Sequence, residues 1–223
     1  MTDAYMPNEL QIKTTIENWK IGSFCFEIER VKNLDELVDQ VSDELFNEDE
    51  RLPYWAELWP SAIAFSRYIV AQPARFRNKS VLELGCGIGM TSLCLHTCQP
   101  AELVLSDYEQ DALEATRSNL LRNGIEPPEM MLLDWRNPDP HRRFDIIVAS
   151  DILYERRFFN PLLNLFEQML EKSGYILLAE PGRPVAKYFF EMARKRNYFF
   201  VFEEEEVVQE GRKIKVYICS IKK

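Results

Sequence analysis

The chain has 223 residues, of which 46% are hydrophobic and 28% are charged. This composition is typical of a globular protein and excludes a disordered chain, and the length suits one α/β domain with a short elaboration. Acidic residues outnumber basic residues by 36 to 27, and the net charge of −9 argues against nucleic acid as a partner, because an acidic surface repels phosphate backbones.

The sequence lacks the signals of secretion, membrane insertion and metal binding. The N-terminal stretch MTDAYMPNEL has no basic segment followed by an apolar one, and no apolar run is long enough to span a bilayer. The five cysteines form no C-x-x-C pair, so we expect free thiols. His96 and His141 stand apart, and we expect no metal. These features predict a soluble, cytoplasmic protein.

The first fifty residues differ in pattern from the rest. Residues 13–20 and 23–30 are typical of two strands that turn at Gly22, because Phe24, Phe26 and Ile28 alternate with polar residues. A short helix is expected next, with an apolar face that carries Leu34, Leu37, Val38 and Val41. We therefore predict a β-hairpin and helix extension over residues 1–52, packed on a main domain over residues 53–223.

From Pro60 onward, predicted helices and strands alternate. Pro60 suits the first turn of a helix, whose buried face should carry Ile63, Phe65, Tyr68 and Ile69. One later helix is expected to end at about Cys98, and another over residues 109–123 has Leu113, Leu120 and Leu121 inward. A third carries Leu162, Leu163, Phe166, Met169 and Leu170 and stops near Gly174, and a fourth runs from Pro184 to about Asn197. Buried strands are expected over residues 80–84, 102–106, 130–133, 144–149 and 175–179, followed by two more over 198–202 and 213–219.

The last two strands are separated only by a loop, so we expect them to pair antiparallel, whereas strands separated by helices pair parallel. The acidic run Glu203 to Glu206 is interpreted as a solvated part of that loop, although it can also attract a basic protein surface. The predicted fold is a doubly wound, mostly parallel α/β sheet with an antiparallel strand near one edge. Ligands of such sheets bind at the carboxyl ends of the strands.

Three of the eight glycines fall within the stretch Glu83-Leu84-Gly85-Cys86-Gly87-Ile88-Gly89, where a strand becomes a helix. Glycine lets the backbone approach a ligand closely, and the helix N-terminus offers free N–H groups. A bare turn is the alternative, but three glycines exceed what a turn requires. A dinucleotide fingerprint would need glycine at Met90 or Ser92, and the lysine of a nucleotide phosphate loop is absent.

Residues 81–93, VLELGCGIGMTSL, resemble the first motif of class I, or seven-β-strand, S-adenosylmethionine-dependent methyltransferases. Asp107 matches the acidic residue that ends the second strand in that family, where a carboxylate can accept both ribose hydroxyls; its alternative role is a helix N-cap. The resemblance implies a Rossmann-like sheet of order 3-2-1-4-5-7-6 and S-adenosyl-L-methionine as cofactor, with S-adenosyl-L-homocysteine as product. It also implies cofactor contacts by Glu83, Gly85, Cys86, Gly87, Gly89, Asp107 and Tyr108.

Further motifs narrow this resemblance. Asp134 and Trp135 end the third strand at the place where the family contacts adenine, although a Trp there can equally be packing. The stretches Tyr54 to Ser61 and Asp151-Ile152-Leu153-Tyr154 resemble the seven-strand protein-lysine methyltransferase group, the methyltransferase family 16 type, and the likeness covers residues 52–181. It implies cofactor contacts by Trp59 and Ser150 and a methyl-acceptor channel at Asp151 and Tyr154, whereas Trp55 is expected in the core.

In-line methyl transfer mainly requires alignment of nucleophile, methyl group and leaving sulfur. Asp151 can position an acceptor amine and help its proton leave, and Tyr154 can face the developing positive charge. The alternative interpretation is that Asp151 caps the next loop and Tyr154 packs under the sheet edge.

The motif Asn-Pro-Pro-Tyr is absent after the fourth strand, which disfavours DNA adenine and protein glutamine as acceptors.

The sequence therefore predicts a protein N-methyltransferase that acts on lysine. A small-molecule N- or O-methyltransferase with a closed pocket and a non-catalytic cofactor-binding scaffold stay as alternatives, and an NAD-dependent oxidoreductase is disfavoured.

Overall fold

A computed structural model of the chain describes residues 13–39, 52–209 and 211–223. Its main sheet has seven strands in the order β5-β4-β3-β6-β7-β9-β8, which confirms the predicted order 3-2-1-4-5-7-6. The first five, all parallel, are β3 (Ser80–Leu84), β4 (Glu102–Asp107), β5 (Glu129–Leu132), β6 (Phe144–Ser150) and β7 (Leu170–Glu180). β9 (Arg212–Lys222) is antiparallel to both of its neighbours, β7 and β8 (Phe199–Gln209).

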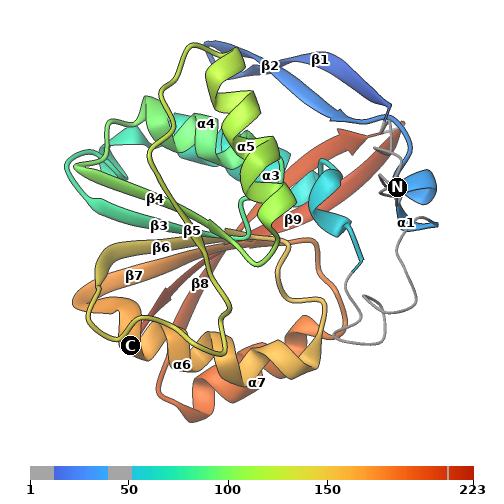
Figure 1. Cartoon of the computed structure of the whole chain (residues 1–223). Helices are drawn as coiled ribbons and strands as arrows, with labels where there is room; N and C mark the ends of the chain where they lie inside the picture. Colours follow the sequence, from blue (N-terminus) through green and yellow to red (C-terminus); the bar gives the residue numbers. More distant parts are fainter. Residues whose placement is uncertain (1–12, 40–51, 210) are drawn as a thin grey trace, which may run out of the picture.

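Helices cover both faces of this sheet (Figure 1). One face carries α3 (Pro60–Ala71), α4 (Met90–Thr97) and α5 (Gln110–Arg122), and the other carries α6 (Phe159–Met169) and α7 (Ala186–Lys195). Short 3-10 turns are η1 (Tyr54–Ala56), η2 (Pro73–Arg75) and η3 (Arg156–Phe158). The fold is thus the doubly wound α/β arrangement predicted, and none of the helices in the described ranges has the length and hydropathy of a membrane span.

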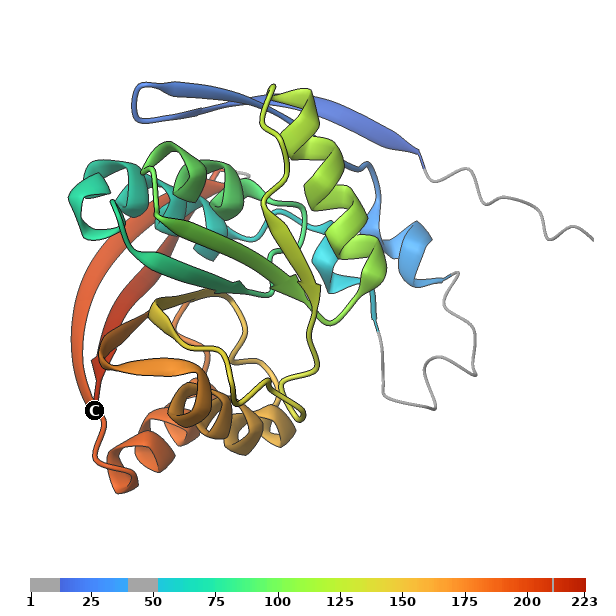
Figure 2. The same cartoon turned by 60° about the vertical axis from the view of Figure 1, so that its left-hand side comes forward.

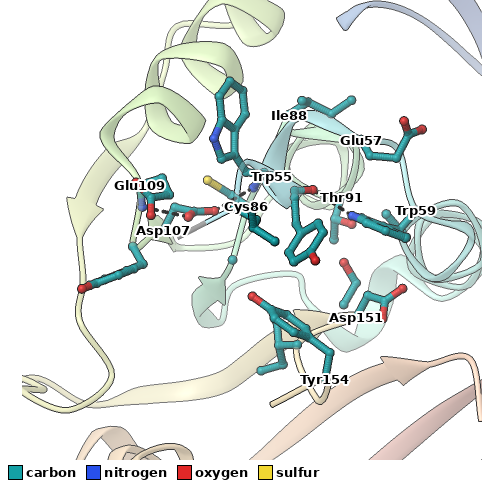
Figure 3. A pocket seen from close by; sticks show the side chains of 18 of the residues that line it. Trp55, Glu57, Trp59, Cys86, Ile88, Thr91, Asp107, Glu109, Asp151 and Tyr154 are labelled. Atoms are coloured by element: carbon teal, nitrogen blue, oxygen red, sulfur yellow. Dashed lines mark hydrogen bonds between the residues drawn. The ribbon is translucent and has the colours of Figure 1, made fainter. Parts of the chain in front are cut away.

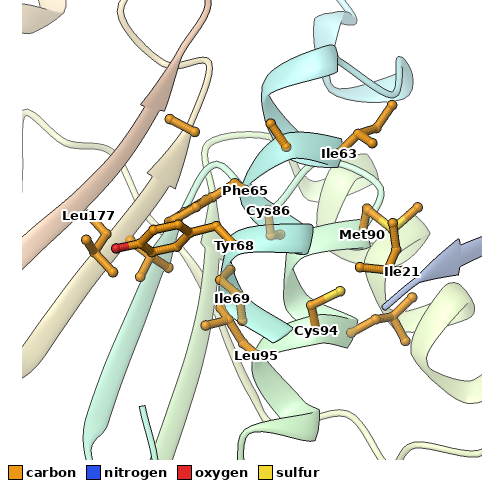
Figure 4. Close-up of a cluster of buried hydrophobic side chains, with 14 of the residues drawn as sticks. Ile21, Ile63, Phe65, Tyr68, Ile69, Cys86, Met90, Cys94, Leu95 and Leu177 are labelled. Atoms are coloured by element: carbon orange, nitrogen blue, oxygen red, sulfur yellow. The ribbon is translucent and has the colours of Figure 1, made fainter. Parts of the chain in front are cut away.

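Two apolar clusters hold these layers together. Figure 4 shows the cluster between the sheet and the helices α3 and α4, where Phe65 and Ile69 of α3 pack near Leu95 of α4. All four residues predicted for the inward face of α3 are buried: Ile63, Phe65, Tyr68 and Ile69. The second cluster joins the opposite sheet face to α6 and α7. Because both faces are covered, the strand ends are the part of the sheet left open to a ligand.

The predicted N-terminal hairpin is present as β1 (Thr14–Ile21) and β2 (Phe24–Val31), and it lies across α5 (Figure 2). Asn119 on α5 and Asn123, the C-cap of that helix, each accept from a β2 backbone N–H and donate to a β2 carbonyl, at 2.7–3.0 Å. Asn119 also donates to the Ile88 carbonyl at 2.8 Å, so one side chain joins the hairpin to the glycine loop. The short helix α1 (Leu34–Val38) buries none of its residues, and Val41 lies outside the described residues.

Three predicted details of the helices and inner strands are wrong. Leu121 is 52% exposed, because Thr116 and Asn119 complete the buried face of α5. The strand predicted as buried over residues 130–133 is β5 at the edge of the sheet, where Met130 and Met131 are only half-buried and Leu132 is 59% exposed. Gly174 does not end α6, which stops at Met169, but lies in β7 against the Asp145 carbonyl, at 2.7 Å from where a Cβ would be.

The C-terminal hairpin is longer than predicted. The acidic run lies inside β8 and not in a loop. Across the hairpin, Glu204 pairs with Lys215 and Glu206 with Lys213, while Val207 is buried. Cross-strand ion pairs of this kind let a charged run form an edge strand.

Candidate active site

A pocket opens at the carboxyl ends of β3, β4 and β6. From β3 the chain continues to β4 on one side and later returns to β6 on the other, so this is the topological switch point of the sheet. The pocket and its mouth together hold about 1000 Å³ of space free of protein atoms, part of which is open to solvent. Ten residues predicted for the site line it: Trp59, Gly85, Cys86, Gly87, Asp107, Tyr108, Trp135, Ser150, Asp151 and Tyr154.

The glycine loop after β3 forms the pocket floor. Gly85 and Gly87 have φ angles of 69° and 55°, in the left-handed region that favours glycine. A Cβ on Gly87 would also lie 3.1 Å from the Trp55 carbonyl, so a side chain there would push the loop away. Gly89, at φ 85°, is the N-cap of α4 and faces Thr116 instead of the pocket. The bare-turn interpretation is weakened, because the loop lines a cavity.

Asp107 ends β4 on one side of the pocket, opposite Trp59 (Figure 3). Its carboxylate accepts from the backbone N–H of Gly87 at 2.9 Å and from that of Glu109 at 3.1 Å. Burial raises the pKa of Asp107 to about 6, against the lowering effect of these hydrogen bonds. Asp107 is not the N-cap of α5, because Glu109 holds that position, but its carboxylate accepts from the Glu109 N–H and also lines the pocket.

Two other predicted residues lie outside the pocket lining. Glu83 is buried beneath the glycine loop and accepts from the Ser92 hydroxyl at 2.6 Å. Burial, helped by the charge of Asp107, raises the pKa of Glu83 to about 8. Asp134 pairs with the neighbouring Arg136 at 2.8 Å. Arg136 in turn donates to the hydroxyl of Tyr108 at 2.7 Å, so Asp134 sits behind a residue that does line the pocket.

Two polar atoms of the pocket lining have no hydrogen-bond partner in the part of the chain that the structure describes. They are the Thr91 hydroxyl and the Trp135 indole N–H, both shielded from solvent. A buried polar atom without a partner costs about 1–3 kcal/mol. S-adenosylmethionine carries acceptors at its adenine and at its carboxylate, so this lining and the glycine loop fit that group. Sequence reasoning missed Thr91, although it follows the glycine cluster by two residues.

A second cavity adjoins the first and is called here the acceptor chamber. Its lining is Leu52, Tyr54, Trp59, Asp151, Tyr154, Glu155 and Arg183, and all but Arg183 also line the first pocket. The Tyr54 ring contacts the rings of Trp59 and Tyr154 edge-on, with centroid separations of 6.2 and 5.9 Å. The chamber therefore combines three aromatic rings with two carboxylates and one guanidinium.

Asp151 follows β6 with a φ angle of 56°, which is strained for a residue other than glycine. Its backbone N–H donates to the Ala179 carbonyl at 2.9 Å, and its side chain is 5% exposed. One carboxylate oxygen accepts twice from Arg183, at 2.7 and 2.9 Å, and the other accepts from the Ser61 hydroxyl at 3.3 Å. Burial raises the pKa of Asp151, and the Arg183 charge opposes that rise.

Tyr154 and Trp55 both line the pocket. Burial is the main cause that raises the pKa of the Tyr154 hydroxyl, which is therefore protonated at neutral pH. Trp55, expected in the core, does pack against it but also lines the pocket. Arg183 was missed, because nothing in the local sequence links it to Asp151, 32 residues away. Within the described residues, no group of three or more His, Cys, Asp or Glu side chains could hold a metal ion.

A family model described as lysine methyltransferase matches residues 42–196. Two relatives share parts of this region. The electron transfer flavoprotein beta subunit lysine methyltransferase of Mus musculus is 32% identical over 133 residues, which are 59% of this chain and 52% of that protein. The protein-lysine N-methyltransferase EEF2KMT of Homo sapiens is 32% identical over 113 residues, or 43% of this chain and 34% of that protein. The chain thus spans about half or less of these relatives.

Solved structures agree on the fold. The ribosomal protein L11 methylase of Lactobacillus delbrueckii has a TM-score of 0.52 at 20% identity and covers 69% of this chain and 75% of its own. The magnesium protoporphyrin IX methyltransferase of Synechocystis, solved with bound S-adenosylmethionine, has a TM-score of 0.56 at 11% identity, with coverages of 82% and 86%. Since the family model matches more than half of the residues, the chain belongs to the lysine methyltransferase family.

Proposed function

We propose that the protein is an S-adenosylmethionine-dependent N-methyltransferase that acts on a lysine side chain of another protein. The observation that carries this proposal is the junction of the two cavities. The glycine-loop pocket with Asp107 opens onto the acceptor chamber, where Asp151 lies beside aromatic rings. Family membership supports the same activity and the same cofactor.

The cofactor would bind along the glycine loop. Asp107 would accept the two ribose hydroxyls, and Trp135 would contact the adenine, with Asp134 behind it. Trp59 would lie near the sulfur. The other lining residues proposed to contact the cofactor are Gly85, Cys86, Gly87, Tyr108 and Ser150. Glu83 and Gly89 would act through the shape of the loop, since neither lines the pocket. When bound, S-adenosylmethionine supplies a methyl group on a positively charged sulfur.

The acceptor lysine would enter the chamber and meet Asp151 and Tyr154. An ammonium has no lone pair, so the proton must leave to water first. The amine lone pair then forms the bond to the methyl carbon, while the bond from that carbon to sulfur breaks and its electron pair stays on sulfur. Asp151 would hold the amine in line, and the faces of the aromatic rings would stabilise the positive charge that develops on nitrogen.

The proposed partner is a protein, and the beta subunit of electron transfer flavoprotein is the first candidate because a relative carries it in its name. A small-molecule acceptor is the alternative. A cytoplasmic location belongs to the proposal, and the five free cysteines are consistent with a reducing compartment.

Two measurements test this proposal in turn. Calorimetric titration with S-adenosylmethionine and with S-adenosylhomocysteine should show micromolar binding of at least one. Labelled methyl transfer is then measured with the candidate flavoprotein subunit and with a cell lysate, and we expect the label on lysine of a protein band. Label in the small-molecule fraction alone would support the alternative acceptor, and binding without transfer to any acceptor would support the non-catalytic scaffold.

The pKa of Asp107 gives a prediction for pH dependence. Ribose hydroxyls donate hydrogen bonds to the ionised carboxylate, whereas protonation of Asp107, with its pKa of about 6, removes acceptors. Affinity for S-adenosylhomocysteine should therefore be constant above about pH 7 and fall below pH 6, by up to about tenfold for each pH unit. Calorimetry across this range tests it. The Asp107→Asn variant should bind more weakly and lose this dependence, and a flat wild-type profile would contradict the prediction.

A further inference from the structure

Both carboxylates of the acceptor chamber already have a cationic partner. Asp151 accepts two hydrogen bonds from Arg183 on one oxygen, and Glu155 accepts from the Nε–H of Arg157. An ammonium that entered the chamber would therefore not meet an unpaired carboxylate. It would instead meet the guanidinium of Arg183, the one lining residue that the chamber does not share with the cofactor pocket.

The position of Arg183 is fixed by its own loop. The Glu180 carboxylate, at the end of β7, accepts from the backbone N–H of Gly182 at 2.8 Å and from that of Arg183 at 2.7 Å. Gly182 has a φ angle of 83°, and a Cβ there would lie 3.2 Å from the Tyr217 ring. The guanidinium carbon lies 5.7 Å from the centroid of the Trp59 ring. Arg183 is thus held between an aromatic ring and Asp151, and it is not a freely moving surface arginine.

We propose that Arg183 is a positioning residue for methyl transfer, which holds Asp151 toward the acceptor and favours the uncharged amine over the ammonium. This inference rests on the proposed function. Arg183 occupies one oxygen of Asp151, and the other oxygen has a single contact, the Ser61 hydroxyl at 3.3 Å. That second oxygen keeps a lone pair, which can accept an N–H from the acceptor amine.

Charged groups on all sides of the chamber act on an acceptor that enters it. A fixed positive charge within a few ångströms disfavours a second cation, and it shifts the equilibrium of a lysine toward the amine. Without Arg183, Asp151 would be an unpaired buried carboxylate that holds the ammonium form. Among the described residues, the titratable and charged groups that line the chamber or the adjoining pocket, together with Glu180 behind Arg183, are Tyr54, Glu57, Cys86, Asp107, Tyr108, Glu109, Asp151, Tyr154, Glu155, Arg157, Glu180 and Arg183. Among these, only Arg183 contacts Asp151 through an ion pair.

The test compares Arg183→Gln, which removes the charge, with Arg183→Lys, which keeps the charge but loses the forked donor. Arg196→Gln is the matched control, because Arg196 at the end of α7 pairs with Glu167 far from the site. Label transfer from S-adenosylmethionine into total lysate protein is measured from about pH 6.5 to 9.5, and S-adenosylhomocysteine affinity is measured by calorimetry.

For Arg183→Gln we expect the rising limb of the pH–rate profile to move up by about one pH unit. The rate near pH 7.5 should then fall about tenfold and recover partly at high pH, while S-adenosylhomocysteine affinity stays within about threefold of wild type. Arg183→Lys should keep the wild-type midpoint with a lower maximal rate, and Arg196→Gln should match wild type.

A loss in Arg183→Gln that is equal at every pH, or that follows a loss of S-adenosylhomocysteine affinity, would overturn the inference, as would an unchanged rate. If wild-type protein binds S-adenosylhomocysteine but labels nothing, the proposed function fails and the inference fails with it. A working wild type with an unshifted variant profile refutes the role of Arg183 alone.

Discussion

The Asp107→Ala variant should lose about a hundredfold in affinity for S-adenosylhomocysteine. Hydrogen bonds to a charged group contribute roughly 1.5–3 kcal/mol each, and the loss of two of them from the ribose hydroxyls exceeds the 2.8 kcal/mol that corresponds to about a hundredfold. The carboxylate also holds the glycine loop through the Gly87 N–H. Calorimetric titration measures the change, and unchanged affinity would refute the proposed role of Asp107.

A measurement of stability distinguishes a loss of cofactor affinity from unfolding of the variant protein. Burial raises the pKa of Asp107 to about 6 in the folded chain, above the ordinary value of 3.8. The folded chain therefore holds the proton of Asp107 more tightly than the unfolded chain does. The stability that this difference contributes is present at low pH and is lost as pH rises through 6. Asp107→Asn, which keeps the shape of the side chain, should be at least as stable as wild type at pH 8. Denaturant unfolding checks this, and a large loss of stability there would mean that Asp107 is structural.

The part of the site that sequence could predict is local. The three glycines and Asp107 lie at ends of strands whose apolar runs are easy to recognise, and parallel strands bring those ends to one edge of the sheet. For the glycines, residue type and position along an element were enough, because a strand-to-helix turn restricts where such side chains can lie. Asp151 and Tyr154 after β6 were instead assigned by resemblance to the protein-lysine methyltransferase group, and both line the pocket.

The rest depends on contacts between residues far apart in sequence. Arg183 reaches Asp151 across 32 positions, and Asn119 reaches β2 across 90. Neither residue belongs to a local pattern, since a lone Arg after a strand and an Asn on a helix usually face solvent. The acidic run was misassigned for a related reason. Its pairing with Lys213 and Lys215 appears only once the hairpin register is known.

The Asp151→Asn variant should retain binding of S-adenosylhomocysteine but lose methyl transfer by about 10²-fold, the size of loss expected when the nucleophile is no longer held in line. Asparagine keeps the size of the side chain and one oxygen that can accept from Arg183, so the chamber should keep its shape. Labelled methyl transfer and calorimetry together measure the two effects. Ser61→Ala, which removes the weaker contact at 3.3 Å, serves as the control and should lose far less activity.

The paired variant Asp151→Asn, Arg183→Gln decides how these two residues act. If Arg183 acts only by holding Asp151, removal of its charge should add little once the carboxylate is gone, and the double variant should transfer methyl groups about as fast as Asp151→Asn alone. Independent contributions would instead multiply, and the double variant would be about tenfold slower than that single variant. Normal turnover in Asp151→Asn would refute the role of Asp151, because the amine would then have to be held by another group, such as the second lining carboxylate Glu155.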